Sequence, residues 1–472
     1  MDRQAVAETL RKHDQEHVLR FFDELDASQQ EALLNQISQI DFDRLEELIE
    51  QYVKNEPEVE IPSQIEPPEI VPARPVDETS ATEQAAGWER GEQLLREGKV
   101  AAFVVAGGQG TRLGYEGPKG CFEVTPIARK SLFQVFAEQI LAASGTYGKT
   151  IPWYIMTSPI NDVATRAFFR QHNYFGLDPD DVFFFTQGTL PSINYDGKLM
   201  LAEKNRLATN PDGHGGSLAA LARSGALEDM AGRGVELISY FQVDNPLVKV
   251  IDPLFLGLHS LREAEMSAKC LPKRDPMEKL GNFCLVDGNV TVIEYSDLPE
   301  ELARQTLPDG RLKFSAGSIA IHAFSRSFVE RLNEGGTCRL PLHRADKEVP
   351  HLDAEGQLVE PEEPNAVKLE MFVFDAMPLA EECVILETER EQEFSPVKNA
   401  AGADSPTTCL HDQVRRAAAW LEEAGVSVPR DADGQIAAAI EISPLFAADA
   451  DELKQKVGED LQIDAGGAVY LE

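Results

Sequence analysis

Five largely apolar runs of strand length alternate with stretches of helical pattern from about residue 99 onward. They are VAAFVVA (100–106), PWYIMTS (152–158), DVFFFTQ (181–187), ELISYFQVD (236–244) and GSIAIHAF (317–324). A short strand without polar alternation is buried on both faces, and helices between such strands allow them to run parallel. The pattern therefore predicts a Rossmann-like α/β fold with a mixed, mostly parallel central sheet.

Two later segments modify this expected core. The run FCLVDGNVTVIEYSD (283–297) places Asp287 and Gly288 between apolar stretches, and this dipeptide predicts an antiparallel hairpin inserted into the sheet. After about residue 385 the pattern is looser, which indicates a small C-terminal domain of mixed type.

The N-terminal residues predict helices, because apolar side chains recur at i, i+3, i+4 and i+7. The two sets are Val18, Phe21, Phe22 and Leu25, then Leu33, Leu34, Ile37 and Ile40. Residues 54–80 contain six prolines among many acidic residues, so we expect an extended connection there. We therefore predict three parts: an N-terminal helical segment with its connection (1–97), a main α/β domain (98–385) and a C-terminal domain (386–472).

Charge and composition exclude several classes of function. The chain has 44 Lys and Arg against 80 Asp and Glu, a formal net charge of −36, which disfavours binding to nucleic-acid backbones and anionic membranes. The six cysteines form no C-x-x-C pair, no histidines have metal-ligand spacing, and no G-x-S-x-G motif occurs. No run approaches the ~20 apolar residues of a membrane span. We expect a cytoplasmic protein without disulfides, a zinc site or a serine nucleophile.

The run VVAGGQGTRLGYEGPKGC (104–121) leaves the first strand and fits neither common phosphate loop. Tyr115 follows Gly114 where a P-loop has lysine, and Leu113 stands where the dinucleotide fingerprint has glycine.

A third kind of anion-binding loop fits these residues. A backbone containing Ala106, Gly107 and Gly108 can approach a base or phosphate closely, and its amides can form an anion-binding concavity. Arg112 adds a fork for phosphate oxygens, and Lys119 adds a mobile point charge. We expect this loop to wrap a phosphorylated ligand.

AGGQGTRLGYEGPKG resembles the nucleotide-binding loop of the eukaryotic-type UDP-sugar pyrophosphorylases, and within them most closely that of the N-acetylglucosamine enzymes. Further motifs resemble that family in the same order, from about residue 15 to residue 410. They are QEHVLRFFDEL, NPDGHGG, VDNPLVKV, VIEYSDL, DGRLKFSAGSIAIH, KLEMFVFD and EFSPVKNA. The resemblance implies a nucleotidyltransferase type A-like fold and the synthesis of a UDP-sugar and pyrophosphate from UTP and a sugar 1-phosphate.

The next candidates lie beyond predicted strands or in a glycine-rich turn. The amide of Gln187 can pair with a pyrimidine edge, as the resemblance implies for the uracil base. The turn with Gly213 and His214 can approach the nucleotide sugar, although the family typically has Asn at the position of His214. Asp244, at the carboxyl end of its strand, is the expected Mg²⁺ ligand, and Asp375 is a second candidate.

The remaining candidates concern the sugar and its phosphate. The resemblance implies that Glu294 and Tyr295 contact sugar hydroxyls and that Lys398 contacts phosphate. Ser318 stands where the N-acetylglucosamine enzymes normally have Asn, and loss of a substrate hydrogen bond changes specificity sharply.

We therefore expect a uridylyltransferase that acts on N-acetylglucosamine 1-phosphate, with Arg112, Lys119 and Lys398 as its catalytic cations and Mg²⁺ as its cofactor. Partners should be small molecules only, with a monomer or weak homo-oligomer. Synthesis of UDP-glucose, or of several UDP-sugars, is the alternative that His214 and Ser318 leave open. Two other classes are a non-catalytic UDP-sugar sensor and an interaction module that uses helices within residues 1–50.

Overall fold

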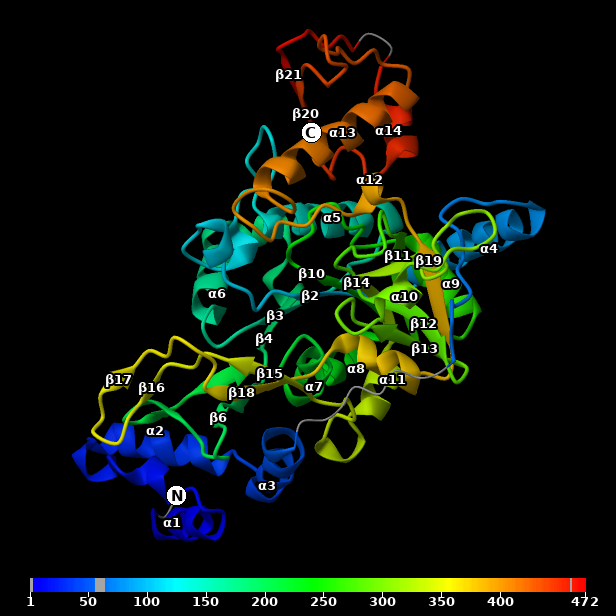
Figure 1. The fold of residues 1–472 in the computed structure, drawn as a ribbon. Helices are drawn as coiled ribbons and strands as arrows, with labels where there is room; N and C mark the ends of the chain where they lie inside the picture. Colours follow the sequence, from blue (N-terminus) through cyan, green and yellow to red (C-terminus); the bar gives the residue numbers. More distant parts are fainter. Residues whose placement is uncertain (1–2, 56–63, 459–460) are drawn as a thin grey trace. The chain divides into compact units, whose positions relative to one another are not determined.

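The structure is a computed structural model that describes residues 3–55, 64–458 and 461–472. These residues belong to two compact units, each built from several stretches of chain (Figure 1). The first unit draws on residues 1–61, 188–217 and 340–373, and the second on residues 62–187, 218–339 and 374–472. The three-part division that we expect from the sequence follows other boundaries and stays a prediction.

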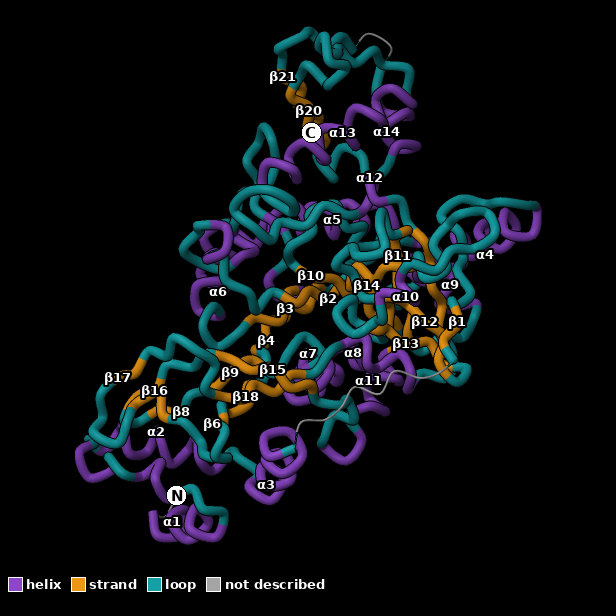
Figure 2. The backbone as a smooth tube through the Cα atoms, viewed as in Figure 1, coloured by secondary structure: helices purple, strands orange, loops and turns teal. Residues whose placement is uncertain are grey.

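In the part of the second unit that is described, ten strands form one sheet. The strands are β1 (Ile65–Glu66), β2 (Val100–Val105), β3 (Trp153–Thr157), β4 (Val182–Thr186), β10 (Leu237–Gln242), β11 (Met266–Pro272), β12 (Asn282–Val286), β13 (Asn289–Ile293), β14 (Ala316–Ser325) and β19 (Cys383–Glu387). The order β1-β12-β14-β10-β2-β3-β4 is joined by β11, which pairs with β14 and β19, and by β13, which pairs with β12. Figure 2 shows these strands in orange.

The predicted mixed, mostly parallel sheet is confirmed. Strands β10, β2, β3 and β4 are parallel neighbours, and β11 and β19 are also parallel. The apolar runs form these strands. Both faces of the sheet are covered, so apolar side chains are needed on each, and Phe103, Trp153 and Tyr240 are fully buried. Ligands of such sheets bind beyond the carboxyl ends of the strands, which is where the candidate loop begins.

Strand β14 is antiparallel to β10, β11 and β12. Strands β12 and β13 form the predicted hairpin, and its turn residues Asp287 and Gly288 have φ values of 50° and 84°. Two positive φ angles are the requirement of a type I′ turn, which explains the choice of residues.

The described part of the second unit also contains helices (Figure 1). They are α4 (Glu78–Arg96), α5 (Leu132–Tyr147), α6 (Asp162–Gln171), α7 (Gly216–Arg223, which begins in the first unit), α8 (Ala226–Arg233), α9 (Pro253–Leu261), α10 (Glu300–Ala303), α11 (Arg326–Leu332), α12 (Arg390–Glu393), α13 (Pro406–Glu423) and α14 (Ala450–Lys456). Short 3₁₀ helices are η4 (Thr111–Leu113), η5 (Lys119–Cys121), η6 (Asn173–Gly176), η7 (Pro179–Asp181), η8 (Glu334–Gly336) and η9 (Val373–Leu379). Side-chain caps start several of them, as Asp252 does for α9.

Helices α4 and α9 touch through their backbones. A Cβ atom added at Gly257 would lie 1.7 Å from the carbonyl oxygen of Gly87, and one added at Gly91 would lie 1.8 Å from that of Pro253. Only glycine allows this approach, so these positions determine how closely the two helices pack.

We expect Gly257→Ala to destabilise the protein by about 3 kcal/mol, the upper end of overpacking costs, because the added methyl group meets backbone that cannot rotate away. The measurement is the urea midpoint of unfolding. Gly232→Ala is the matched control: Gly232 lies on the exposed side of α8 with no atom within 4 Å of its added Cβ. It should be neutral or stabilising by up to ~1 kcal/mol. Equal midpoints for Gly257→Ala and wild type would contradict the packing explanation.

The C-terminal part of the second unit has a small core of its own. Ala418, Leu421, Ile440 and Leu453 are buried together there, and β20 (Ala439–Ile442) pairs in parallel with β21 (Ala468–Leu471). Residues 406–458 and 461–471 therefore have the mixed character expected from the sequence.

The first unit combines the N-terminal helices with short strands. Its elements are α1 (Arg3–Lys12), η1 (Glu16–Leu19), η2 (Phe22–Glu24), α2 (Ala27–Ser38), α3 (Phe42–Leu48), the π-helix η3 (Ile49–Lys54), β5 (Thr189–Pro191), β6 (Ile193–Asn194), β7 (Leu201–Glu203), β8 (Arg206–Leu207), β9 (Thr209–Pro211), β15 (His343–Lys347), β16 (His351–Leu352), β17 (Leu358–Val359) and β18 (Ala366–Glu370). Phe21 and Leu33 share a core with Ile193 and Val367. These helices are therefore packed within their unit.

Two N-terminal predictions need correction. The stretch from Val18 to Leu25 is not one α-helix but the two 3₁₀ turns η1 and η2, whose apolar residues are still buried. Glu24 donates its amide to the Phe21 carbonyl three residues back, because tertiary packing overrides a periodic pattern of this length. The predicted connection (54–80) falls partly on residues 56–63, which lie outside the described residues, while β1 and the start of α4 occupy part of the rest.

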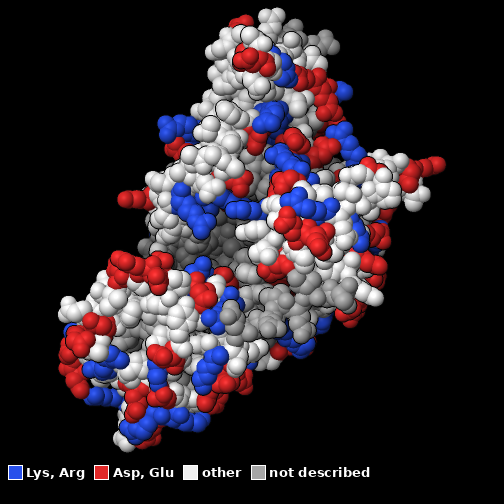
Figure 3. Space-filling view, in the orientation of Figure 1, with Lys and Arg blue, Asp and Glu red and all other residues white. Residues whose placement is uncertain are grey.

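No helix in the described ranges has the length and apolar character required to cross a bilayer. Acidic side chains are spread over the face drawn in Figure 3, with Lys and Arg among them. The large negative charge is thus carried at least partly by solvated surface residues.

Candidate active site

The loop that follows β2 begins at Ala106, which is fully buried and whose amide bonds to β3. Two backbone hydrogen bonds close the loop. The amide of Gly110 donates to the carbonyl of Gly117 at 2.9 Å, and that of Lys119 donates to the carbonyl of Gly108 at 3.1 Å. The loop therefore folds back on itself and leaves Gly108 exposed.

A buried asparagine that sequence reasoning missed holds this loop. The Asn161 Nδ2 donates to the carbonyls of Ala106 at 2.9 Å and Gly108 at 3.2 Å, while its Oδ1 accepts from the Ser158 amide at 2.8 Å. Asn161 follows β3 by four residues. A side-chain amide shortly after a predicted strand was the available signal, but the two loop carbonyls that it holds lie more than fifty residues away in the sequence.

The two cations of the loop sit on its short helical turns. Arg112 lies on η4 and is exposed, and Lys119 begins η5 and is half-buried. Neither makes an ion pair with any described residue, although Asp and Glu outnumber Lys and Arg in this chain. Unpaired cations beside backbone amides are available to phosphate oxygens.

Gln187 lies directly beyond β4 and beside the loop. The backbone N–H of Gln187 donates to the carbonyl of Thr157 at 2.8 Å. A Cβ atom added at Gly107 would lie 2.9 Å from the Oε1 atom of Gln187. The two predicted residues therefore come together, and a side chain at position 107 would displace the end of the Gln187 side chain.

Asp244 lies two residues beyond β10, at the same carboxyl edge as the loop. Its carbonyl accepts a hydrogen bond of 2.8 Å from the amide of Val397, so the residue before Lys398 is joined to it. The Lys398 Nζ lies 5.9 Å from the centre of the Phe394 ring. The structure therefore brings two predicted site residues from distant parts of the sequence to adjoining backbone positions.

The candidates for sugar binding lie on the antiparallel side of the same sheet. Ser318 is half-buried on β14, and its amide donates to the Gly281 carbonyl at 2.8 Å. Glu294 and Tyr295 follow β13 instead of lying on it as predicted, because pairing in the hairpin ends at Ile293. Tyr295 is 40% exposed.

Gly213 and His214 belong to the first unit. The Nδ1 of His214 accepts a hydrogen bond of 3.1 Å from the amide of Val373, and the ring stacks on Phe372 with centres 5.3 Å apart. Because an N–H donates to Nδ1, the ring proton of the neutral imidazole belongs on Nε2. His214 thus has a defined donor position, as an asparagine amide would.

The backbone amides of the neighbouring glycines bond within the turn. The amide of Gly215 donates to the carbonyl of Met371 at 2.8 Å, and that of Gly216 donates to the carbonyl of Gly213 at 3.1 Å. Gly213 has a φ of 84°, and a Cβ atom there would lie 2.3 Å from the Met371 carbonyl. These amides are used to fold the turn against Met371 and are not free for a base or sugar.

Two observations bear on the chemistry available. Burial raises the pKa of the Cys121 thiol, next to the loop, to about 12, so this thiol is protonated at neutral pH and is a poor nucleophile. Among the described residues no cluster of three or more His, Cys, Asp or Glu could hold a metal. Asp375 lies on η9.

An edge with a folded amide loop, unpaired cations and one strand-end carboxylate suits a ligand that carries several phosphates. Together with the Rossmann-like sheet, it defines the class of protein as a nucleotidyltransferase. The chain belongs to the UTP–glucose-1-phosphate uridylyltransferase family, whose sequence model matches residues 42–405. The resemblance noted in the motifs is therefore confirmed.

Known proteins are similar over nearly the whole chain. UDP-N-acetylhexosamine pyrophosphorylase-like protein 1 of Xenopus tropicalis is 39% identical, with 93% of this chain and 92% of that protein covered. UDP-N-acetylglucosamine diphosphorylase 2 of Arabidopsis thaliana is 37% identical, with coverage of 94% and 89%. The crystal structure of the uridine diphosphate N-acetylglucosamine pyrophosphorylase from Trypanosoma brucei in complex with an inhibitor has a TM-score of 0.81 at 25% identity, with coverage of 100% and 98%.

Proposed function

We propose that this protein transfers the uridylyl group of UTP to N-acetylglucosamine 1-phosphate and releases UDP-N-acetylglucosamine and pyrophosphate. The observation that carries the choice of sugar is the 37% identity, over 94% of the chain, to a relative named for UDP-N-acetylglucosamine. The unpaired cations at the carboxyl edge of the sheet support the reaction type.

In the proposed mechanism, a phosphate oxygen of the sugar 1-phosphate attacks the α-phosphorus of UTP in line, and the bond to the bridging oxygen of pyrophosphate breaks. The nucleophile is already anionic, so neither an enzyme nucleophile nor a general base is required. The main barrier is repulsion between two anions. Arg112 and Lys119 hold the triphosphate and Lys398 holds the incoming phosphate, so their charges offset this repulsion and fix the geometry.

Magnesium is part of this proposal, with Asp244 as its protein ligand. No described residue makes a hydrogen bond or ion pair with the Asp244 carboxylate, which is half-buried at the strand end. Mg²⁺ needs only one or two carboxylates because phosphate oxygens and water complete its coordination, so a single carboxylate fits. When bound, the ion would neutralise phosphate charge.

The proposal also gives roles in recognition of the base and sugar to the other candidate residues. We assign the side-chain amide of Gln187 to the uracil edge, and the contact of His214 with the nucleotide sugar stays the prediction made from the motif NPDGHGG. Glu294 and Tyr295 are assigned to the hydroxyls of the transferred sugar, and Ser318 to its 2-substituent.

Parallel assays with N-acetylglucosamine 1-phosphate and glucose 1-phosphate, each with UTP and magnesium, test the proposal. We expect a higher kcat/KM for the acetylated sugar. Equal or reversed values would overturn the choice of sugar and favour a UDP-glucose or broad UDP-sugar pyrophosphorylase, which Ser318 keeps as the second candidate. UDP-sugar binding without turnover of either substrate would favour a sensor.

We expect Ser318→Asn to shift the ratio of kcat/KM values toward the acetylated sugar by roughly fivefold, because one further hydrogen bond contributes about 1 kcal/mol. The ratio from the two assays is the measurement. Ser296→Asn is the control, since Ser296 is exposed near the same hairpin and should leave the ratio unchanged. An unchanged ratio for Ser318→Asn would remove Ser318 from the sugar site.

We also propose a cytoplasmic location and a monomer or weak homo-oligomer. All six cysteines are free thiols, which agrees with a reducing compartment.

A further inference from the structure

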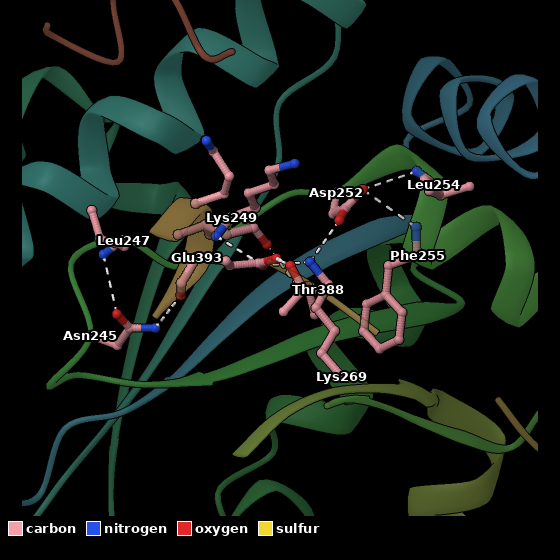
Figure 4. A network of polar contacts seen from close by, with 12 residues as sticks. Asn245, Leu247, Lys249, Asp252, Leu254, Phe255, Lys269, Thr388 and Glu393 are labelled. Atoms are coloured by element: carbon pink, nitrogen blue, oxygen red, sulfur yellow. Dashed lines mark hydrogen bonds and ion pairs between the residues drawn. The ribbon is translucent and has the colours of Figure 1, made fainter. Parts of the chain in front are cut away.

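The second unit contains a buried ion network around Lys269, Asp252 and Glu393 (Figure 4). Lys269 on β11 bonds to Asp252, the N-cap of α9, at 2.6 Å between Nζ and Oδ2, and also to Glu393 at the end of α12. The exposed fractions of the Lys269 and Glu393 side chains are 1% each. Burial lowers the pKa of Lys269, but the two carboxylates outweigh it and hold that pKa above its ordinary value. Lys269 is therefore a cation at neutral pH.

Glu393 is held from three directions. Its carboxylate accepts from Lys269, from the amide of Lys249 at 3.2 Å and from the Thr388 hydroxyl at 2.7 Å. Its carbonyl accepts from the Asn245 Nδ2 at 2.7 Å. Both ends of this residue are thus tied to other parts of the unit.

The chain continues from Glu393 to Lys398 along a second set of bonds. The Ser395 amide donates to the Asn245 Oδ1 at 3.0 Å, and the Val397 amide donates to the Asp244 carbonyl at 2.8 Å. Ser395 and Val397 are buried. Lys269 is therefore linked to Lys398 through the Glu393 carboxylate and the segment 393–397, which is fixed by hydrogen bonds at Glu393, Ser395 and Val397.

The sheet is irregular at Lys269 on β11. Pairing of β11 with β14 shifts between Ala268 and Cys270, and Ala320 on β14 has a φ of 55°. Bulges of this kind redirect side chains and are common beside active sites. The same irregularity lies opposite Ser318, which pairs with Cys270.

Stability alone is a weak reason for such a network, because desolvation of buried charges offsets most of their attraction. We propose that Lys269 and Glu393 are positioning residues, which hold the segment 393–397 so that Lys398 and Asp244 face the same substrate phosphates. This inference rests on the proposed function of Lys398. Neither positioning residue touches the substrate.

Glu393→Gln tests the proposal, since it keeps the shape of the side chain and leaves Lys269 paired with Asp252. We expect kcat/KM for the sugar 1-phosphate to fall 10- to 100-fold, while the Kd for UTP, measured by calorimetry, changes less than threefold. Hydrogen exchange followed by mass spectrometry should show lost protection of the Ser395 and Val397 amides.

Glu138→Gln is the matched control. Glu138 pairs with Lys130 at 2.5 Å, with exposed fractions of 4% and 5%, in the same unit, and neither residue belongs to the segment 393–397. It should retain both kcat/KM and the protection of Ser395 and Val397. If Glu393→Gln does not fold, Thr388→Val, which removes one donor to Glu393, should give a three- to tenfold loss with the same exchange signature.

Unchanged kcat/KM or unchanged protection in a folded Glu393→Gln variant would overturn the proposal. So would equal losses in Glu138→Gln. Lys398→Ala, assayed in parallel, shows whether the positioning proposal or the proposed role of Lys398 has failed. Full activity of Lys398→Ala would reject the role of Lys398, whereas the exchange data would still report whether the network holds the segment.

Discussion

Arg112→Ala should lower kcat/KM for UDP-sugar synthesis by a hundredfold or more. Arg112 lies on η4 within the loop, is exposed, and has no ion-pair partner among the described residues. In the proposed reaction it contacts the triphosphate where negative charge moves onto the leaving pyrophosphate. Loss of one preorganised donor of this kind costs about 3 kcal/mol. Steady-state kinetics with pyrophosphate release as the signal is the measurement.

Two comparisons make the result specific for Arg112. Arg112→Lys should recover only part of the activity, because an ammonium cannot form the two parallel bonds of a guanidinium. Arg170→Ala is the control, since Arg170 is also exposed and without an ion pair in the described ranges, but lies near the end of α6. Full turnover by Arg112→Ala would reject the proposed mechanism.

Lys398→Ala should have an effect of similar size, but on the other substrate. The backbone bond between Val397 and Asp244 joins the residue before Lys398 to the end of β10, where the proposed reaction brings the sugar phosphate to the nucleotide. Removing its charge leaves the repulsion between the two anions uncompensated. We expect about a hundredfold lower kcat/KM for the sugar 1-phosphate and an almost unchanged Kd for UTP.

Rates measured with each substrate varied at saturating levels of the other separate these effects. Lys149→Ala is the control, because Lys149 is exposed and makes no ion pair with a described residue. A loss confined to UTP binding would move Lys398 to the triphosphate and contradict our assignment.

Much of the fold could be predicted because the signal is local. The apolar runs around Phe103, Ile155 and Ile238 indicated buried parallel strands, and Asp287-Gly288 indicated the hairpin, since the residue types are required by backbone geometry and burial. The helical period at Val18–Leu25 identified the buried residues correctly. It predicted the wrong backbone conformation, because two short 3₁₀ turns bury the same side chains as an α-helix would.

The loop cations, Gln187, Asp244 and Lys398 were recognisable from residue type, strand-end position and family motifs. Asn161, Lys269 and Glu393 were not, because each acts through a partner distant in sequence. The role of each of these residues depends on which atoms the fold brings into contact with it.

The sequence by itself determined the α/β class, the family and the residues able to carry the chemistry, because these depend on local pattern and residue type. Only the tertiary structure decided that the Asp244 and Val397 backbones meet, that Gly107 passes Gln187, and that a buried lysine holds the segment before Lys398. Such contacts arise when strands far apart in the chain become neighbours in the sheet, and no local pattern specifies that register.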